Sequence, residues 1–177
     1  MDNNFSDPYS RIIMHKTLLI VDDETDIRDT LAETLKTLDA EIYLANDGVE
    51  ALKIIKSNRI MAIISDVNMP NMKGTELLKS IRDLGFLTPF VILTAYGDKK
   101  MALDALKLGA FDFIDKPWSD EKLFSVTQKI LEIGNEILFW ESEIDIQRSI
   151  LGYQDENSKR VIAALTREQG FDFKKKL

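Results

Sequence analysis

Short apolar runs rich in β-branched residues alternate with longer stretches of helical period from Lys16 onward. Apolar runs bounded by polar loops are typical of buried parallel strands, and apolar residues three or four positions apart predict helices. The expected strands are 17–21, 41–45, 61–65, 90–94 and 112–114. The expected helices between and after them are 25–38, 47–57, 75–84 and 99–108. This alternation predicts an α/β fold, a doubly wound five-stranded parallel sheet with helices on both faces.

A last helix is predicted to start after the N-cap Ser119 and to reach Leu151, because this stretch has no proline and a single glycine, Gly134. That glycine could still mark a bend. Apolar residues recur at alternating spacings of three and four, the pattern of a coiled-coil seam. A helix of this length spans roughly 50 Å, whereas a five-residue strand covers about 17 Å. The distal half is therefore expected to overhang its own domain.

The apolar residues of the overhang need a partner surface. The candidate seam consists of Ile133, Ile137, Trp140, Ile144 and Leu151. A second copy of the same helix and a fold-back of the C-terminal segment both remain open. We favour the homodimer, because most soluble oligomers are symmetric homodimers.

Four segments are expected along the chain. Residues 1–15 are predicted to be a flexible arm and residues 16–131 one domain. Residues 132–157 would extend the last helix into a possible coiled coil and a turn. Residues 158–177 would form one short helix, 158–169, and a disordered tail.

Composition narrows the function classes. The 177 residues include 23 basic and 30 acidic ones, and the net charge of -7 argues against nucleic acid as a partner. The chain has no cysteine, which excludes disulfides and thiolate chemistry. No apolar run approaches the roughly 20 residues of a membrane span, and the N-terminus lacks the layout of a secretory signal. We therefore expect a cytoplasmic protein with no membrane partner.

Polar and charged residues follow the expected strands where each one ends. Asp22, Asp23 and Glu24 follow the first strand, Asp66 follows the third, Thr94 ends the fourth and Lys116 comes after the fifth. Ligands of doubly wound sheets bind outside the carboxyl ends of the strands, so these groups are expected to converge. Carboxylate oxygens with several retained waters suit Mg²⁺. The alternative is that the aspartates are ordinary loop or cap residues.

The segments "LLIVDDETDIR", "IISDVNMPNMKG", "VILTAYGD" and "GAFDFIDKPW" resemble, in this order, the receiver domain of bacterial two-component response regulators. The resemblance covers about residues 16–131 and implies a flavodoxin-like sheet with strand order 2-1-3-4-5. It implies that Asp66 accepts a phosphoryl group. It also implies that Mg²⁺ is bound by Asp23, Asp66 and the backbone carbonyl of Asn68, and through water by Asp22.

The resemblance extends to switching and to partners. Thr94 and Lys116 would contact the phosphoryl group, and Thr94 with Phe113 would form the conformational switch. Asn68 and Tyr96 would flank the acyl phosphate, and we expect Tyr96 to lengthen its lifetime by shielding it from water. A sensor histidine kinase or a phosphotransfer protein would supply the phosphoryl group, and a downstream protein partner would receive the signal.

Two other functions remain to be weighed. A Mg²⁺-dependent phosphatase of the dehalogenase type also uses an aspartate nucleophile in a doubly wound fold, but it needs Asp-x-Asp after the first strand, where Asp22-Asp23-Glu24 stands. A receiver-like scaffold or dimerisation module would work without phosphorylation. The resemblance favours a signalling switch over an enzyme, one that catalyses only phosphotransfer to its own Asp66 and its autodephosphorylation.

Overall fold

The computed structural model describes the backbone of residues 15–95 and 99–151, with their side chains except those of residues 99 and 145–151. Five strands are present: β1 (Lys16–Val21), β2 (Ala40–Ala45), β3 (Ala62–Asp66), β4 (Phe90–Thr94) and β5 (Asp112–Asp115). The α-helices are α1 (Thr25–Leu35), α2 (Gly48–Ser57), α3 (Gly74–Asp83), α4 (Lys99–Lys107) and α5 (Asp120–Leu151).

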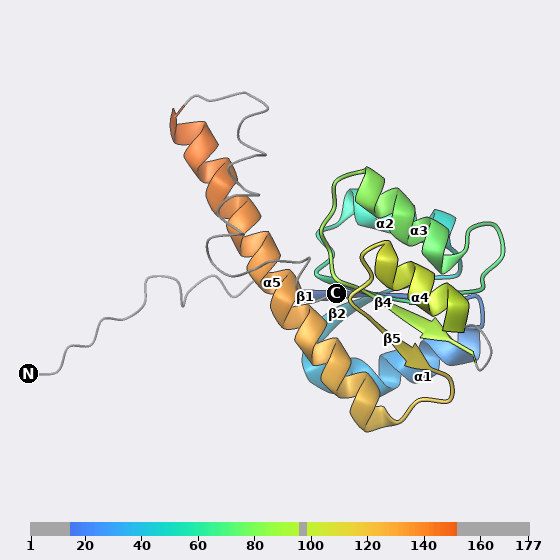
Figure 1. Ribbon diagram of the computed structural model, residues 1–177. Coiled ribbons are helices and arrows are strands. Elements are labelled where there is room, and N and C mark those ends of the chain that lie inside the picture. Colours follow the sequence, from blue (N-terminus) through green and yellow to red (C-terminus); the bar gives the residue numbers. More distant parts are fainter. Residues whose placement is uncertain (1–14, 96–98, 152–177) are drawn as a thin grey trace, which may run out of the picture.

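The strands form one parallel sheet in the order β2-β1-β3-β4-β5. Helices α2, α3 and α4 cover one face, and α1 and α5 cover the other (Figure 1). This confirms the predicted doubly wound, flavodoxin-like fold and its strand order. The order changes direction beside β1, which is where such folds place their ligands.

The two faces of the sheet give two hydrophobic cores because neighbouring residues of a strand point to opposite sides. Leu19 and Val21 of β1 pack with α2, α3 and α4, whereas Leu18 and Ile20 pack with α1 and α5. All four side chains are fully buried. A sheet covered on both faces explains why its strands are continuous apolar runs rather than alternating ones.

Most element boundaries agree with the sequence patterns. Asp47 caps α2 as expected, accepting a hydrogen bond from the backbone N–H of Glu50 at 2.8 Å. Gly109, expected to end α4, has a φ of +91°, a value that favours glycine. The first helix is shorter than predicted: α1 stops at Leu35 and a 3-10 turn covers Lys36–Leu38.

A half-buried arginine ties α3 to the segment after α4. Arg82, in the last turn of α3, donates hydrogen bonds to the carbonyl oxygens of Phe86, Thr88 and Gly109 at 2.9–3.0 Å. Burial lowers the pKa of its guanidinium to about 10, so the group stays cationic at neutral pH. It satisfies carbonyls near the C-terminal ends of both helices, where a cation is favoured.

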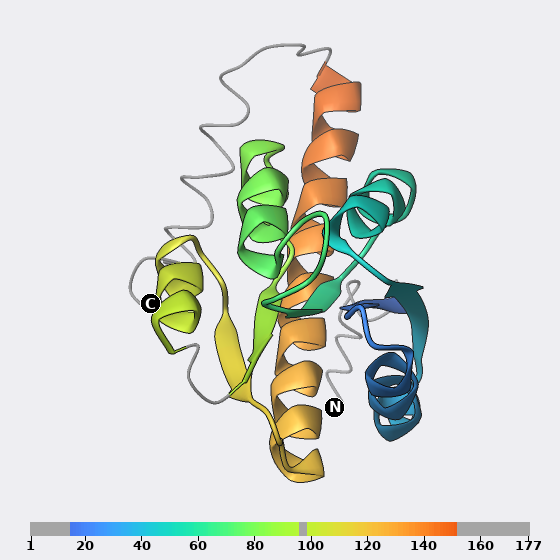
Figure 2. The same ribbon diagram turned by 90° about the vertical axis from the view of Figure 1, so that its right-hand side faces the viewer.

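Helix α5 is continuous through Gly134, so this glycine does not mark a bend (Figure 2). A Cβ at residue 134 would lie 1.9 Å from the carbonyl oxygen of Met61, just before β3. The glycine therefore allows the helix to pass against the backbone of the sheet. Beyond this contact α5 runs past the sheet (Figures 1 and 2).

The residues of the candidate seam lie next to the docked face of α5, which is the face that packs on the sheet. Leu123, Ile130 and Leu131 are buried in the core, whereas Ile133, Ile137 and Ile144 are half-buried and Trp140 is exposed. The side chain of Leu151, the arm before residue 15 and the predicted helix 158–169 with its tail lie outside the described residues. Among the helices of residues 15–95 and 99–151, none contains an apolar stretch that could span a lipid bilayer.

Candidate phosphorylation site

The strand ends bring the predicted site residues to one edge of the sheet, at the arrowheads of Figure 1. In the ladder, Val21 pairs with Ser65, Asp66 with Leu93 and Thr94 with Asp115. Asp22 follows Val21 and Lys116 follows Asp115. The side chains of Asp22, Asp66, Thr94 and Lys116 therefore all lie at the carboxyl edge of the sheet. The sequence pattern places Asp66 just after the third strand, whereas in the structure Asp66 is the last residue of β3.

An ammonium group joins the two carboxylates nearest the centre of this edge. Nζ of Lys116 lies 2.9 Å from Oδ2 of Asp22 and 2.5 Å from Oδ1 of Asp66. The side chains of Lys116, Asp22 and Asp66 are 19%, 1% and 9% exposed, respectively. A cation and two anions held this far from bulk water interact much more strongly than an exposed ion pair. The lysine follows β5 and begins a cis Lys116–Pro117 peptide bond.

Burial and the ion pairs shift the pKa values in this cluster. Burial raises the pKa of the Asp66 carboxyl group, and Lys116 and the N–H of Asn68 oppose this shift without cancelling it. Burial alone would lower the pKa of Lys116, but its hydrogen bonds to Asp66 and Asp22 outweigh that effect and raise it. Burial disfavours the charged form of the Asp66 carboxyl group, and Lys116 provides a fixed positive charge beside it. Such a pair suits a nucleophile that attacks an anionic substrate.

Backbone contacts fix the two carboxylates. Oδ1 of Asp22 accepts from the N–H of Glu24 at 2.9 Å, and Oδ2 of Asp66 accepts from the N–H of Asn68 at 2.6 Å. Arg28 of α1 donates to the carbonyl oxygen of Asp22 at 2.5 Å. These contacts orient each carboxylate before any ligand arrives.

Ser65 and Gly74 support Asp66 from behind, and neither role was recognised from the sequence. The hydroxyl of Ser65 donates to the carbonyl oxygen of Asp66 at 2.9 Å. A Cβ at residue 74 would lie 2.2 Å from that same oxygen, so glycine is required for α3 to start there. Gly74 could have been suspected from its place at the end of "MPNMKG", but the contact itself depends on how the loop after β3 folds back on Asp66, which hydrophobic periodicity does not show.

The remaining predicted site residues lie around this cluster. Thr94 is fully buried, and its hydroxyl donates to the carbonyl oxygen of Ala95 over a long 3.4 Å. Asp23 and Asn68 are exposed at the rim. Phe113 is half-buried against the core on the side of α4. Tyr96 lies outside the described residues.

The donor set fits a magnesium ion that keeps several waters. Asp22, Asp23 and Asp66 offer hard oxygens, yet among the described residues no three acidic or histidine side chains converge closely enough to hold a metal alone. Magnesium in phosphoryl-transfer sites is commonly bound by one or two carboxylates, with waters and phosphate oxygens completing the octahedron. The residues fit that kind of site rather than a cage built of protein ligands.

Comparison with known proteins places this geometry in a family. The family model of the response regulator receiver domain matches residues 18–128. The chain belongs to the response regulator receiver family. Receiver domains of this family are signalling switches of two-component systems rather than enzymes in the ordinary sense.

Individual relatives agree with the family assignment. The chain is 30% identical over 152 residues to the transcriptional regulatory protein FixJ of Rhizobium meliloti, covering 84% of this chain and 73% of FixJ. It is 31% identical over 121 residues to the transcriptional regulatory protein TdiR of Thauera aromatica, covering 68% of this chain and 53% of TdiR. The chain therefore spans about half the length of TdiR.

Solved structures show the same fold. A receiver domain protein from Clostridium thermocellum has a TM-score of 0.65 at 27% identity, covering 69% of this chain and 98% of its own. The N-terminal part of FixJ has a TM-score of 0.63 at 32% identity, covering 68% and 96%, respectively. Both likenesses cover about the length of the receiver.

Proposed function

We propose that this receiver accepts a phosphoryl group on Asp66 and passes the signal on through protein contacts, in the cytoplasm. The observation that carries the proposal is the ion-paired cluster of Asp22, Asp66 and Lys116 at the carboxyl edge of the sheet. A sensor histidine kinase or phosphotransfer protein would be the donor. Output would pass to a downstream protein partner or through a homodimer formed by α5.

The chemistry follows from the positions of the groups. One carboxylate oxygen of Asp66 attacks the phosphorus, the bond from phosphorus to the donor's leaving group breaks, and an acyl phosphate remains. Lys116, now 2.5 Å from Asp66, is close enough to pair with a phosphoryl oxygen as charge builds up there. Water later hydrolyses the acyl phosphate and restores the carboxylate.

The residues that would hold Mg²⁺ are Asp23, Asp66 and the carbonyl oxygen of Asn68, with Asp22 acting through water. When bound, the ion neutralises charge on the transferring oxygens. Asn68 and Tyr96 would set the lifetime of the acyl phosphate by their place beside it.

The switch that we propose consists of Thr94 and Phe113. The long hydrogen bond from Thr94 to Ala95 is weak enough to be exchanged for one to a phosphoryl oxygen. That exchange would draw the end of β4 inward and open space for the ring of Phe113 to rotate. The surface formed by α4, β5 and the start of α5 would change shape as a result.

The deciding experiment is phosphorylation of the full chain by a small acyl phosphate with Mg²⁺, followed by intact-mass measurement. We expect one phosphoryl group on the parent chain and none on Asp66→Asn. Asp83→Asn, on the exposed end of α3, serves as the matched control and should react like the parent. A parent chain that is never phosphorylated would leave the alternative, a scaffold that works without phosphorylation.

A further inference from the structure

The loop between β3 and α3, residues 67–73, carries Asn68, whose backbone carbonyl belongs to the proposed magnesium site. Hydrogen bonds close the loop at its two ends. The N–H of Asn68 donates to Oδ2 of Asp66 at 2.6 Å, and the N–H of Gly74 donates to the carbonyl oxygen of Val67 at 3.1 Å. The middle of the loop needs support of its own if the carbonyl oxygen of Asn68 is to hold one direction.

Asp47, the N-cap of α2, provides such support from another element. Its Oδ2 accepts a hydrogen bond from Nδ2 of Asn71, in the middle of the loop, at 2.7 Å. Its Oδ1 accepts from the backbone N–H of Glu50 at 2.8 Å. The same carboxylate therefore caps α2 with one oxygen and holds the loop after β3 with the other.

The backbone of the loop is shaped for this contact. Asn71 has a φ of +61°, a left-handed value that asparagine adopts more readily than most residues other than glycine. The next residue, Met72, is half-buried and packs on the start of α2, where a Cβ at residue 48 would lie 2.6 Å from its Cγ. The first turn of α2 thus holds two successive loop residues, one by a polar contact and one by an apolar contact.

We propose that Asp47 and Asn71 are positioning residues for the magnesium site, whose hydrogen bond fixes the loop so that Asp66 and the carbonyl of Asn68 can bind one ion. This inference rests on the proposed function, because it needs Mg²⁺ to bind there. Contacts to the residues that hold a metal typically change its affinity 10–100-fold. The contact between Asp47 and Asn71 acts through the loop, so we expect its loss to raise the dissociation constant of Mg²⁺ at least about threefold.

Two variants break the contact from opposite sides. Asn71→Gly keeps the positive φ and removes the amide, but it also adds backbone freedom. Asp47→Ser leaves residue 71 unchanged and keeps an oxygen that can cap α2, but it has no second oxygen for the loop. Each variant should weaken Mg²⁺ binding at least about threefold, and the double variant should bind no more weakly than the weaker single one, because both changes remove the same interaction.

A third variant separates the hydrogen bond from the charge. Asp47→Asn removes the same negative charge as Asp47→Ser, and asparagine is an equally good N-cap. Its amide oxygen can accept from the N–H of Glu50, and its NH₂ group can donate to the side-chain oxygen of Asn71 once that amide turns over. We therefore expect Asp47→Asn to bind Mg²⁺ with nearly parental affinity.

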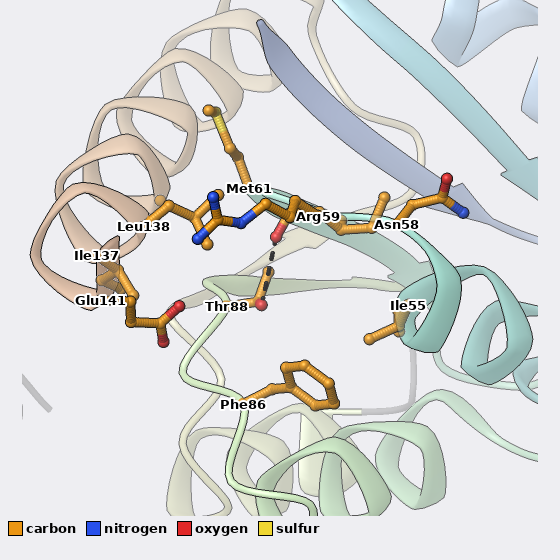
Figure 3. Close-up of a pocket in the computed structure, with 11 residues that line it drawn as sticks. Ile55, Asn58, Arg59, Met61, Phe86, Thr88, Ile137, Leu138 and Glu141 are labelled. Carbon is orange, nitrogen blue, oxygen red and sulfur yellow. Dashed lines mark hydrogen bonds between the residues drawn. The ribbon is translucent and has the colours of Figure 1, made fainter. Parts of the chain in front are cut away.

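The matched control removes a similar hydrogen bond from the other end of α2. Nδ2 of Asn58 donates to the carbonyl oxygen of Ile54 at 2.9 Å. Asn58 lines a pocket of about 120 Å³ near the amino ends of β3 and β4, at the edge of the sheet opposite Asp66 (Figure 3). A general loss of stability in α2 would affect Asn58→Gly as well, whereas the proposed role predicts parental Mg²⁺ binding for it.

Two measurements on the full chain follow the effect. NMR titration with MgCl₂ gives the dissociation constant, and hydrogen exchange of the Gly74 amide in metal-free buffer reports how firmly the loop is closed. We expect this amide to exchange at least about threefold faster in Asn71→Gly and Asp47→Ser, and at the parental rate in Asp47→Asn and Asn58→Gly.

The outcomes separate this inference from the proposed function. Asn71→Gly and Asp47→Ser chains that bind Mg²⁺ as tightly as the parent would overturn the positioning role alone. An equal loss in Asp47→Asn or in Asn58→Gly would also overturn it, because charge or general stability would then explain the effect. A parent chain that binds no Mg²⁺ would overturn the proposed metal site together with this role, and phosphorylation of Asp66, measured by intact mass, is a separate result.

Discussion

Two carboxylates and one ammonium share a space with little solvent at the ends of β1, β3 and β5, so removal of the ammonium would leave like charges facing each other. The side chains of Asp22 and Asp66 are 1% and 9% exposed. Breaking a buried ion pair by deleting one partner typically costs 3–5 kcal/mol. For this partly solvated cluster we expect Lys116→Met to lower the free energy of unfolding by about 3 kcal/mol.

Urea unfolding at neutral pH measures that loss. Lys122→Met is the matched control, because Lys122 is 53% exposed and its ion pair with Asp112 is 3.5 Å long. Its free energy of unfolding should stay within about 0.5 kcal/mol of the parent. Equal losses in the two variants would contradict an energetically important ammonium at the site.

The titration of Asp66 gives a second prediction at this scale. Burial raises its pKa, so the carboxylate should form at a pH above the ordinary aspartate value of about 3.9. Lys116 opposes that rise, and its removal in Lys116→Met should therefore shift the midpoint still higher. Because the folded-state pKa is the higher one, the stability linked to the protonated group is present at low pH and is lost as the pH rises through that midpoint.

Carbon NMR of the carboxyl group, assigned by comparison with Asp66→Asn, follows this titration. Metal-free buffer keeps the comparison simple, since a bound cation would lower the pKa. A midpoint at or below the ordinary aspartate value, or a lower one in Lys116→Met, would show that burial does not dominate at Asp66.

The sequence predicted which residues meet at this site but not how they are supported. Parallel strands put their carboxyl ends at one edge, so Asp22, Asp66, Thr94 and Lys116 could be grouped from the strand pattern alone. The roles of Ser65 and Arg28 depend on where a hydroxyl or a guanidinium group points. Hydrophobic periodicity contains no information about such directions.

At the scale of elements, the closest approach between α5 and the sheet occurs at Gly134. A Cβ there would lie 1.9 Å from the Met61 carbonyl oxygen, which belongs to the backbone and cannot rotate away. Replacing glycine by alanine within a helix normally stabilises it by up to about 1 kcal/mol. Here we expect Gly134→Ala to destabilise the fold by about 2 kcal/mol, because the helix must move off the sheet.

Thermal and urea unfolding of Gly134→Ala test this directly. Asn135→Ala, at the next position of α5, is the control and should change stability by no more than about 0.5 kcal/mol. A stabilised Gly134→Ala chain would show that α5 does not pass so close to β3.

The same contact explains what the sequence could and could not foresee about α5. The absence of proline predicted a long helix, and the helix does run from Asp120 to Leu151. Its three-and-four spacing suggested one seam, whereas the structure separates a docked face that includes Leu131 from a flank that includes Trp140. Sequence spacing could not show where the docked face ends. That limit depends on the close contact between Gly134 of α5 and the carbonyl group of Met61, just before β3.

At the scale of the whole molecule, the proposed phosphorylation site and the overhanging half of α5 lie at opposite edges of the sheet, and α5 extends from one edge to the other. It begins three residues after Pro117, beside the site, and passes the amino end of β3 at Gly134. Rotation of Phe113 or movement of β5 would act on the first turns of α5, and a continuous helix transmits a rigid displacement. We therefore expect the beryllofluoride phosphate mimic with Mg²⁺ to change the dimer dissociation constant by at least about fivefold.

Linkage makes this expectation testable from both ends of α5. If the mimic changes dimer affinity by a given factor, dimerisation must change the affinity for the mimic by the same factor. The mimic should therefore bind the parent chain and a Trp140→Ala variant, in which the proposed α5 dimer is weakened, with affinities that differ accordingly, while Asp66→Asn should show no effect of the mimic on its mass. Equal affinities in the two chains, with an unchanged dimer constant, would mean that α5 holds the two edges together without coupling them.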